Sequence, residues 1–257
     1  MMKRFLLILP ILFALASCEK EEDVSKKECT PGFTTISGRI VTTDNSPLKG
    51  VKVGLKYVEQ SMFSYHSWLK RTTTTDANGF YSMSFNIEDG EVMSFEGQSY
   101  SYFDLQVDLG NLDQDKYFLS CYSVESSTSN SLNSNLSLKQ DTTYNMSFYF
   151  PTKGHIAVTL KGFQPTQTGD CFEVQTFFPW GSKSDGKNML NTEYGISSSG
   201  YDNFVAKTYT QTFSNVPVAL NDTNIVRIVK VKNGVATPED HKIFIPENKA
   251  IELTYEY

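Results

Sequence analysis

The sequence predicts an all-β protein with two consecutive β-sandwich domains. Strands are indicated by segments in which apolar and polar residues alternate with a period of two. The clearest of these segments are Val51–Tyr57, Phe103–Leu109, Tyr144–Phe148 and Ile251–Tyr255. No segment of about ten or more residues has the apolar spacing of a helix. The segments are short and separated by Gly, Asn, Asp and Pro, which is typical of β-sandwiches.

The chain starts with features of a secretory signal. Lys3 and Arg4 precede a mostly apolar stretch, Phe5–Ala16, which has the length of a signal peptide and is too short to span a bilayer. The end of this stretch and the two residues after it, Leu15-Ala16-Ser17-Cys18, resemble the lipobox of bacterial lipoproteins. The resemblance implies cleavage before Cys18 and lipid on its sulfur and new amino group. We therefore expect residues 1–17 to be a lipoprotein signal peptide and the membrane to be a partner through the lipid anchor.

Residues 18–31 are polar and predict a tether. Four acidic residues follow the anchor cysteine: Glu19, Glu21, Glu22 and Asp23. This acidic run resembles the export signal of surface lipoproteins of the Bacteroidetes. The resemblance implies an outer-membrane, lipid-anchored protein that faces the cell exterior. The periplasmic leaflet is the alternative placement.

Charge and cysteine content indicate which partners and which compartment to expect. The net charge is −6, and removing Lys3 and Arg4 with the signal leaves 21 basic against 29 acidic residues, or −8. An acidic chain without a basic stripe argues against nucleic acid as a partner. After lipidation of Cys18 three cysteines remain in an oxidising compartment. We expect a disulfide between Cys29 and Cys121, which share the first predicted domain; burial as free thiols is the alternative.

The remaining predicted strands lie between the clearest ones. They are Ile36–Thr42, Phe80–Phe85, Tyr117–Tyr122, Ile156–Leu160, Phe172–Phe177, Phe204–Phe213, Ile225–Lys232 and Ile243–Ile245. Residues 123–143 are rich in Ser, Thr and Asn and predict a long polar loop, with one short edge strand at Leu136–Leu138 as the alternative. Turn residues at 150–154 separate two strands, so we expect one domain over residues 32–152 and a second over 153–257.

The first domain carries a family pattern in three pieces. They are Ile36-Ser37-Gly38-Arg39-Ile40-Val41, Pro47-Leu48-Lys49-Gly50-Val51-Lys52-Val53 and Thr74-Thr75-Asp76-Ala77-Asn78-Gly79-Phe80-Tyr81. Together they resemble the carboxypeptidase regulatory-like domain, which implies a transthyretin-like, Ig-like β-sandwich that acts as an accessory module. In this pattern Asp76 is expected to accept backbone N–H groups, and Gly79 to supply a positive φ.

No enzyme chemistry is evident, so we expect a protein that is not an enzyme and holds no cofactor or metal. A zinc peptidase needs a His-x-x-Glu pair, but none of His66, His155 and His241 has a Glu three residues later. Gly195–Gly200 departs from the Gly-x-Ser-x-Gly motif by one position, and we interpret it as a serine-rich loop.

Aromatic residues provide the predicted binding site. Three aromatic stretches lie, respectively, between two predicted strands, before a strand and at the end of a strand: Met62–Trp68, Ser99–Phe103 and Phe177–Gly181. Rings in polar loops can form platforms for sugars or hot spots for protein partners. We therefore predict ligand contacts from these residues: Tyr65, Trp68, Tyr100, Tyr102 and Trp180. The alternative is that these rings cover the sandwich ends or pack into the cores.

Two function hypotheses follow. The first is a non-enzymatic, surface-anchored outer-membrane lipoprotein that binds a glycan or protein partner and assists nutrient uptake. The second is a structural or adhesive cell-surface component, such as an assembly subunit. Asp141-Thr142-Thr143 also resembles the O-glycosylation motif of the Bacteroidetes, which implies a glycan on Thr142.

Overall fold

A computed structural model describes residues 32–91, 93–97, 99–119, 131–200 and 202–257. Within these ranges the chain is built of β-strands and has no α-helix, which confirms the predicted all-β, sandwich-forming fold class. The same part of the chain contains no helix that is both long enough and apolar enough to cross a membrane.

The first half of the chain contributes nine strands and one short 3-10 turn among the described residues. These elements are β1 (Thr34–Val41), η2 (Thr43–Asn45), β2 (Lys52–Gln60), β3 (Tyr65–Thr74), β4 (Phe80–Phe85), β5 (Ser94–Glu96), β6 (Ser99–Asp108), β7 (Ser131–Leu136), β8 (Thr143–Asn145) and β9 (Phe148–Tyr149).

The second half contributes seven strands among the described residues. They are β10 (Lys153–Lys161), β11 (Cys171–Lys183), β12 (Tyr194–Ser199), β13 (Thr210–Ala219), β14 (Asp222–Lys232), β15 (Val235–Ile245) and β16 (Glu252–Glu256). The β14–β15 hairpin turns at Asn233 and Gly234, which both have positive φ, as a two-residue turn between twisted strands requires. This turn makes β15 much longer than the segment Ile243–Ile245 predicted from alternation.

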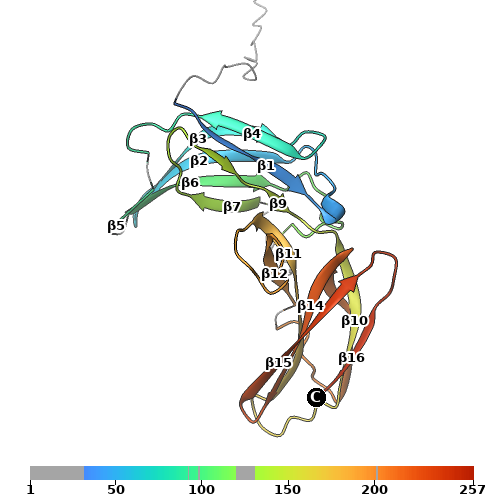
Figure 1. Ribbon diagram of the computed structural model, residues 1–257. Coiled ribbons are helices and arrows are strands. Elements are labelled where there is room, and N and C mark those ends of the chain that lie inside the picture. The colour runs from blue at the N-terminus through green and yellow to red at the C-terminus, as the bar shows by residue number, and fades with distance from the viewer. Residues whose placement is uncertain (1–31, 92, 98, 120–130, 201) are drawn as a thin grey trace, which may run out of the picture. The chain divides into compact units, whose positions relative to one another are not determined.

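The strands form three sheets (Figure 1). One has the order β3-β2-β6-β5, with β7 also paired to β6. A second has the order β15-β14-β11-β9-β1-β4, with β12 paired to β11 and β8 paired to β1. The third is β13-β10-β16, in which the C-terminal strand β16 runs parallel to β10.

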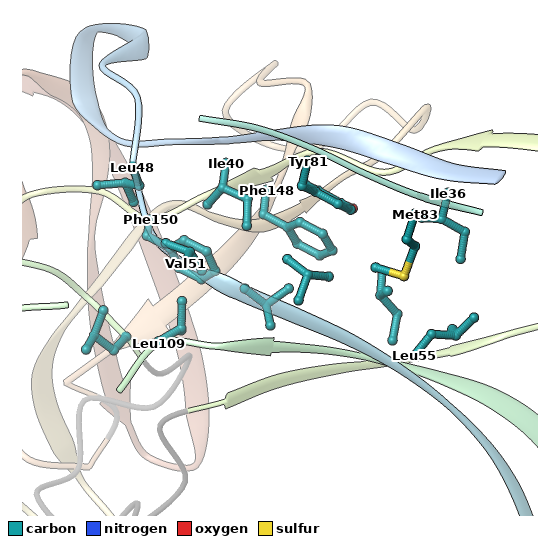
Figure 2. Close-up of a cluster of buried hydrophobic side chains, with 14 of the residues drawn as sticks. Ile36, Ile40, Leu48, Val51, Leu55, Tyr81, Met83, Leu109, Phe148 and Phe150 are labelled. Carbon is teal, nitrogen blue, oxygen red and sulfur yellow. The ribbon is translucent and has the colours of Figure 1, made fainter. Parts of the chain in front are cut away.

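The first hydrophobic core lies between β1 and β4 on one side and β2 and β6 on the other. Figure 2 shows Ile40, Tyr81 and Met83 from the first pair and Leu55 from β2 filling this space. Alternation places Leu55 inside and its neighbour Lys56 outside, so the period-two pattern of the sequence corresponds directly to the two sheet faces.

The turn before β4 has the structure expected from the family pattern. The Oδ1 atom of Asp76 accepts the backbone N–H groups of Asn78 at 2.8 Å and Phe80 at 2.9 Å. Gly79 has a φ of 75°, and a Cβ there would lie 2.5 Å from the carbonyl oxygen of Ile40. The expected structural roles of Asp76 and Gly79 are therefore confirmed.

A second core packs β10, β13 and β16 against β11 and β14, around Val158, Phe172 and Val226. The two cores share one long strand. β11 supplies Phe172 to the second core, whereas its later residues Phe178 and Trp180 belong to the first. The link is β9, which pairs with β1 on one side and with β11 on the other. The boundary predicted between residues 152 and 153 stays a prediction, and two β11 residues beyond it lie in the first core.

Several local interpretations were wrong. Gly195–Ser199, interpreted as part of a serine-rich loop, lies in strand β12, where Ser197 and Ser199 are buried. The aromatic stretches Met62–Trp68 and Ser99–Phe103 were placed in loops or before strands, but Tyr65–Trp68 lies in β3 and Ser99–Phe103 lies in β6. Each error arose because pairing with another strand, β11 for β12 and β2 for β3 and β6, creates these strands, and local composition does not.

Candidate functional site

The predicted aromatic residues of the first domain lie on the sheet β3-β2-β6-β5. Its register aligns Tyr65 on β3 with Gln60 on β2, Gln60 with Tyr100 on β6, and Tyr100 with Phe95 on β5. Paired residues project from the same face of a sheet, and residues two apart on a strand do so as well. Tyr65, Tyr100 and Tyr102 therefore share one face.

This face points away from the first core, because Phe103, next to Tyr102, is fully buried on the opposite side. We call Tyr65, Phe95, Tyr100 and Tyr102 the outer aromatic face. The ring centroids of Phe95 and Tyr100 lie 6.5 Å apart, and those of Tyr100 and Tyr102 lie 6.2 Å apart, with near-parallel rings in both pairs.

The rings of the outer aromatic face are accessible to a partner. Phe95 is 72% exposed and Tyr65 is 58% exposed. Partial burial, together with the neighbouring Tyr65, Asp104 and Tyr100, raises the pKa of Tyr102, so these groups interact electrostatically. Exposed aromatic rings gathered on one face of a sheet are unusual for a surface that only meets water.

Asp104 lies beside this face and is almost wholly buried, at 5% exposed. Its Oδ2 atom accepts a hydrogen bond from Gln106 at 2.9 Å, but its buried Oδ1 atom has no hydrogen-bond partner. Lys56 is its partner in the β2–β6 register and favours the charged form. Burial is nevertheless the larger effect and raises the pKa of Asp104.

The substitution Asp104→Asn is expected to stabilise the protein at neutral pH. The pKa of Asp104 is raised in the folded state, so the fold favours its protonated carboxyl. That contribution to stability is fully present below the unfolded pKa of about 3.9 and is lost as the pH rises through the folded pKa. Urea unfolding at pH 7 should show a gain of about 1 kcal/mol for the variant, and a smaller gain at pH 4. Asp108→Asn, at the exposed end of the same strand, is the control. Equal effects of Asp104→Asn at both pH values would contradict this account.

Trp68 lies on the opposite face of the same sheet. It pairs with the buried Tyr57 on β2, and their ring centroids are 6.0 Å apart. The ring of His66 also lies near the indole, with ring centroids 6.0 Å apart and an interplanar angle of 25°. Trp68 is 48% exposed, so the prediction of an accessible indole agrees with the structure. The four predicted residues of this domain are thus divided between two faces: Trp68 on one, and Tyr65, Tyr100 and Tyr102 on the other.

A β-bulge shapes the surface next to Trp68. The β2–β3 register passes from Leu55↔Arg71 to Lys56↔Leu69, so Lys70 is the extra residue. Its Nζ lies 2.8 Å from both carboxylate oxygens of Glu91 and 3.4 Å from Glu88.

A cleft of about 500 Å³ opens beside this ion pair. The residues that line it, which we call the Trp68 cleft, include Tyr57, Glu59, Trp68, Lys70, Glu88 and Glu91. Its volume lies in the range typical of small-ligand sites.

Trp180 was predicted as a ligand contact, but it is buried, in agreement with the other interpretation of these rings, packing into a core. Trp180 is only 9% exposed, and its Nε1 donates to the carbonyl oxygen of Phe118 at 2.9 Å. Its ring packs edge-on against Phe150, with centroids 5.7 Å apart. The physical reason is that β11 continues to Lys183 and pairs with β9, so Trp180 lies within a strand beside the first core.

Other predicted sites are described only in part. Cys18, Cys29 and Cys121 lie outside the described residues, so the lipid anchor and the disulfide stay predictions. Within the described ranges the one cysteine is Cys171, which is a free thiol. Thr142 is half-buried and its Oγ1 donates to the carbonyl oxygen of Gln140 at 3.0 Å; its glycosylation also stays a prediction.

The described part of the chain contains no group of three or more His, Cys, Asp and Glu residues placed to hold a metal ion. The carboxylates of the Trp68 cleft and the ring of Phe95 were not predicted from the sequence. No local signal marks them, because β5 is only three residues long and the cleft depends on the position of a bulge.

Comparisons with known proteins place the chain in no established family. No family model matches the sequence. No curated protein matches it either. The regulatory-like domain therefore stays a resemblance in sequence pattern.

Solved structures of low similarity include two pilins and a protein of a family without assigned function. The shaft pilin SpaA of Lactobacillus rhamnosus GG is 14% identical, with 88% of this chain and 98% of that chain covered and a TM-score of 0.29. The D312A variant of BcpA, the major pilin subunit of Bacillus cereus, is 10% identical over 83% and 69% of the two chains, with a TM-score of 0.28. A DUF3823 family protein from Parabacteroides merdae is 13% identical over 83% and 100%, with a TM-score of 0.26. TM-scores this low do not establish a shared topology.

Proposed function

We propose that this chain is a structural or adhesive component of the bacterial cell surface that contacts a protein partner through its outer aromatic face. The observation that carries the proposal is the row of Tyr65, Tyr100 and Phe95 across β3, β2, β6 and β5, continued by Tyr102. These rings face solvent and contribute nothing to either hydrophobic core.

The shape of this surface favours a protein over a glycan. The four rings are distributed over the face of a sheet, and the cleft beside Trp68 opens on the opposite side. Aromatic residues on a broad face are typical of protein interfaces, where a few rings provide most of the binding energy. A non-enzymatic role agrees with this arrangement.

The cellular location is part of the proposal. The lipobox-like Leu15–Cys18 and the acidic run after it support a lipid anchor on the outer membrane with the chain facing outward. Adhesion to an external partner requires that the outer aromatic face is exposed at the cell exterior. Digestion of the chain by protease on intact cells, with a periplasmic marker left intact, is the control for this placement.

Attachment of cells that carry the full-length chain to immobilised proteins and glycans tests the function. We expect attachment to one or more proteins, and a loss of about tenfold or more in the double variant Tyr65→Ala/Tyr100→Ala. The matched control is Tyr209→Ala, an exposed tyrosine outside the outer aromatic face. Attachment to glycans alone would favour a glycan receptor, and unchanged attachment of the double variant would exclude the outer aromatic face as the contact surface.

A further inference from the structure

The Trp68 cleft combines aromatic rings with an excess of negative charge. It contains three carboxylates, Glu59, Glu88 and Glu91, and a single cation, Lys70. Lys70 contacts both oxygens of Glu91 at 2.8 Å and only one oxygen of Glu88, at 3.4 Å. One ammonium group therefore leaves an uncompensated charge of about −2 around the cleft.

Glu59 is the carboxylate most available to a ligand. It lies on β2, between His66 on β3 and Ser101 on β6 in the register. Among the described residues its carboxylate forms no ion pair and no hydrogen bond. By contrast, Glu91 is occupied, because its Oε2 atom also accepts the backbone N–H of Glu88 at 2.8 Å.

The two aromatic rings of the cleft, those of Tyr57 and Trp68, have fixed positions at which a ligand can contact them. Tyr57 is buried at the floor of the cleft and packs on Phe103 at 5.2 Å, so it cannot move freely. Trp68 stacks on Tyr57 and leaves about half of its surface exposed. Indole is the aromatic ring that attracts cations best, and flanking carboxylates strengthen that attraction.

We infer that the Trp68 cleft binds an organic ammonium group, which stacks on the Trp68 indole and pairs with Glu59. Lys70 pairs with Glu91, which leaves Glu59 free to pair with the ligand. The ammonium group can come from a lysine side chain of a partner protein or from an amino sugar. This site lies on the face opposite the outer aromatic face and does not rest on the function proposed above.

Isothermal titration of the full-length chain in nonionic detergent tests this inference. The charged probes are tetralysine and the glucosamine tetramer. Each has a neutral control of the same backbone: tetralysine with acetylated side chains, and the N-acetylglucosamine tetramer. Both peptides carry an acetylated N-terminus and an amidated C-terminus, so that only the side-chain ammonium groups differ. We expect a charged probe to bind at least about tenfold more tightly than its acetylated control, and less tightly as salt is added. Binding of one charged probe and not the other identifies the source of the ammonium group.

Variants assign the binding to the cleft. Trp68→Ala and Glu59→Gln should each weaken binding of the charged probe by about threefold to tenfold. Both residues are exposed, so folding should persist, and thermal unfolding checks this. The matched controls are Glu96→Gln, an exposed carboxylate on β5, and the double variant Tyr65→Ala/Tyr100→Ala; both should bind normally.

Three results would overturn the inference. Equal binding of charged and acetylated probes would indicate a neutral ligand, and absence of binding by all four probes would exclude the site. If the Glu59→Gln and Trp68→Ala variants bind the charged probe as tightly as the unchanged chain does, the acidic chain attracts cations without a specific cleft. Because the double variant Tyr65→Ala/Tyr100→Ala disables only the outer aromatic face, failure here and failure of the adhesive function are distinguishable.

Discussion

Trp180→Ala is expected to lower the free energy of unfolding by about 3–5 kcal/mol, the range for truncating a large buried aromatic residue. The side chain is buried in the first core. Earlier residues of the same strand, β11, belong to the second core. Its loss would leave a cavity beside Phe150 and would remove the Nε1 hydrogen bond to the carbonyl oxygen of Phe118. That carbonyl would then be buried without its partner.

Chemical unfolding followed by circular dichroism measures this effect. Trp180→Phe is the informative companion, because it keeps a ring in the core and removes the hydrogen bond, so it should cost about 1–2 kcal/mol. Tyr209→Ala, at an exposed site, should change stability by less than about 0.5 kcal/mol. A cost for Trp180→Ala no larger than that of Tyr209→Ala would show that Trp180 does not pack as described.

Gly38→Ala should have the second largest effect, a loss of about 3 kcal/mol or failure to fold, at the upper end of the range for overpacking. A Cβ on Gly38 would lie 1.8 Å from the carbonyl oxygen of Met146 and 2.5 Å from its carbonyl carbon. Both are backbone atoms, so no side-chain rotation relieves the clash. β1 and the chain around Met146 would have to separate.

The separation would break contacts that hold the β1–β8 pair. The N–H of Met146 donates to the carbonyl oxygen of Ser37 at 2.7 Å, and the hydroxyl of Tyr81 donates to the carbonyl oxygen of Met146 at 2.6 Å. Gly54→Ala on β2 is the matched control, since its nearest neighbour, Thr72 Cγ2, would be 3.7 Å away. It should be neutral or slightly stabilising. Equal thermal unfolding of both variants would contradict the predicted clash.

The candidate site could be predicted from the sequence only in its residue types. Tyr65, Trp68, Tyr100 and Tyr102 were predicted as accessible aromatics, and all four lie on one sheet. Their division between two faces depends on strand register, which pairs residues more than thirty positions apart, such as Gln60 with Tyr100. A shift of one residue would exchange the faces; the alternation at Phe103–Leu109 specifies the face in β6, but β3 has no such alternation.

The sequence by itself determined the features that depend on near neighbours. Alternation at Val51–Tyr57 and Phe103–Leu109 specified strands with one buried face, and the Asp76–Gly79 turn followed from side-chain-to-backbone hydrogen bonds and glycine's backbone freedom. Only the tertiary structure decided that Trp180 is buried, that β12 is a strand, and that Lys70, the extra residue of the bulge, lines the Trp68 cleft. These outcomes require pairing with other strands, and the energy of that pairing depends on the partner strand as well as on the local sequence.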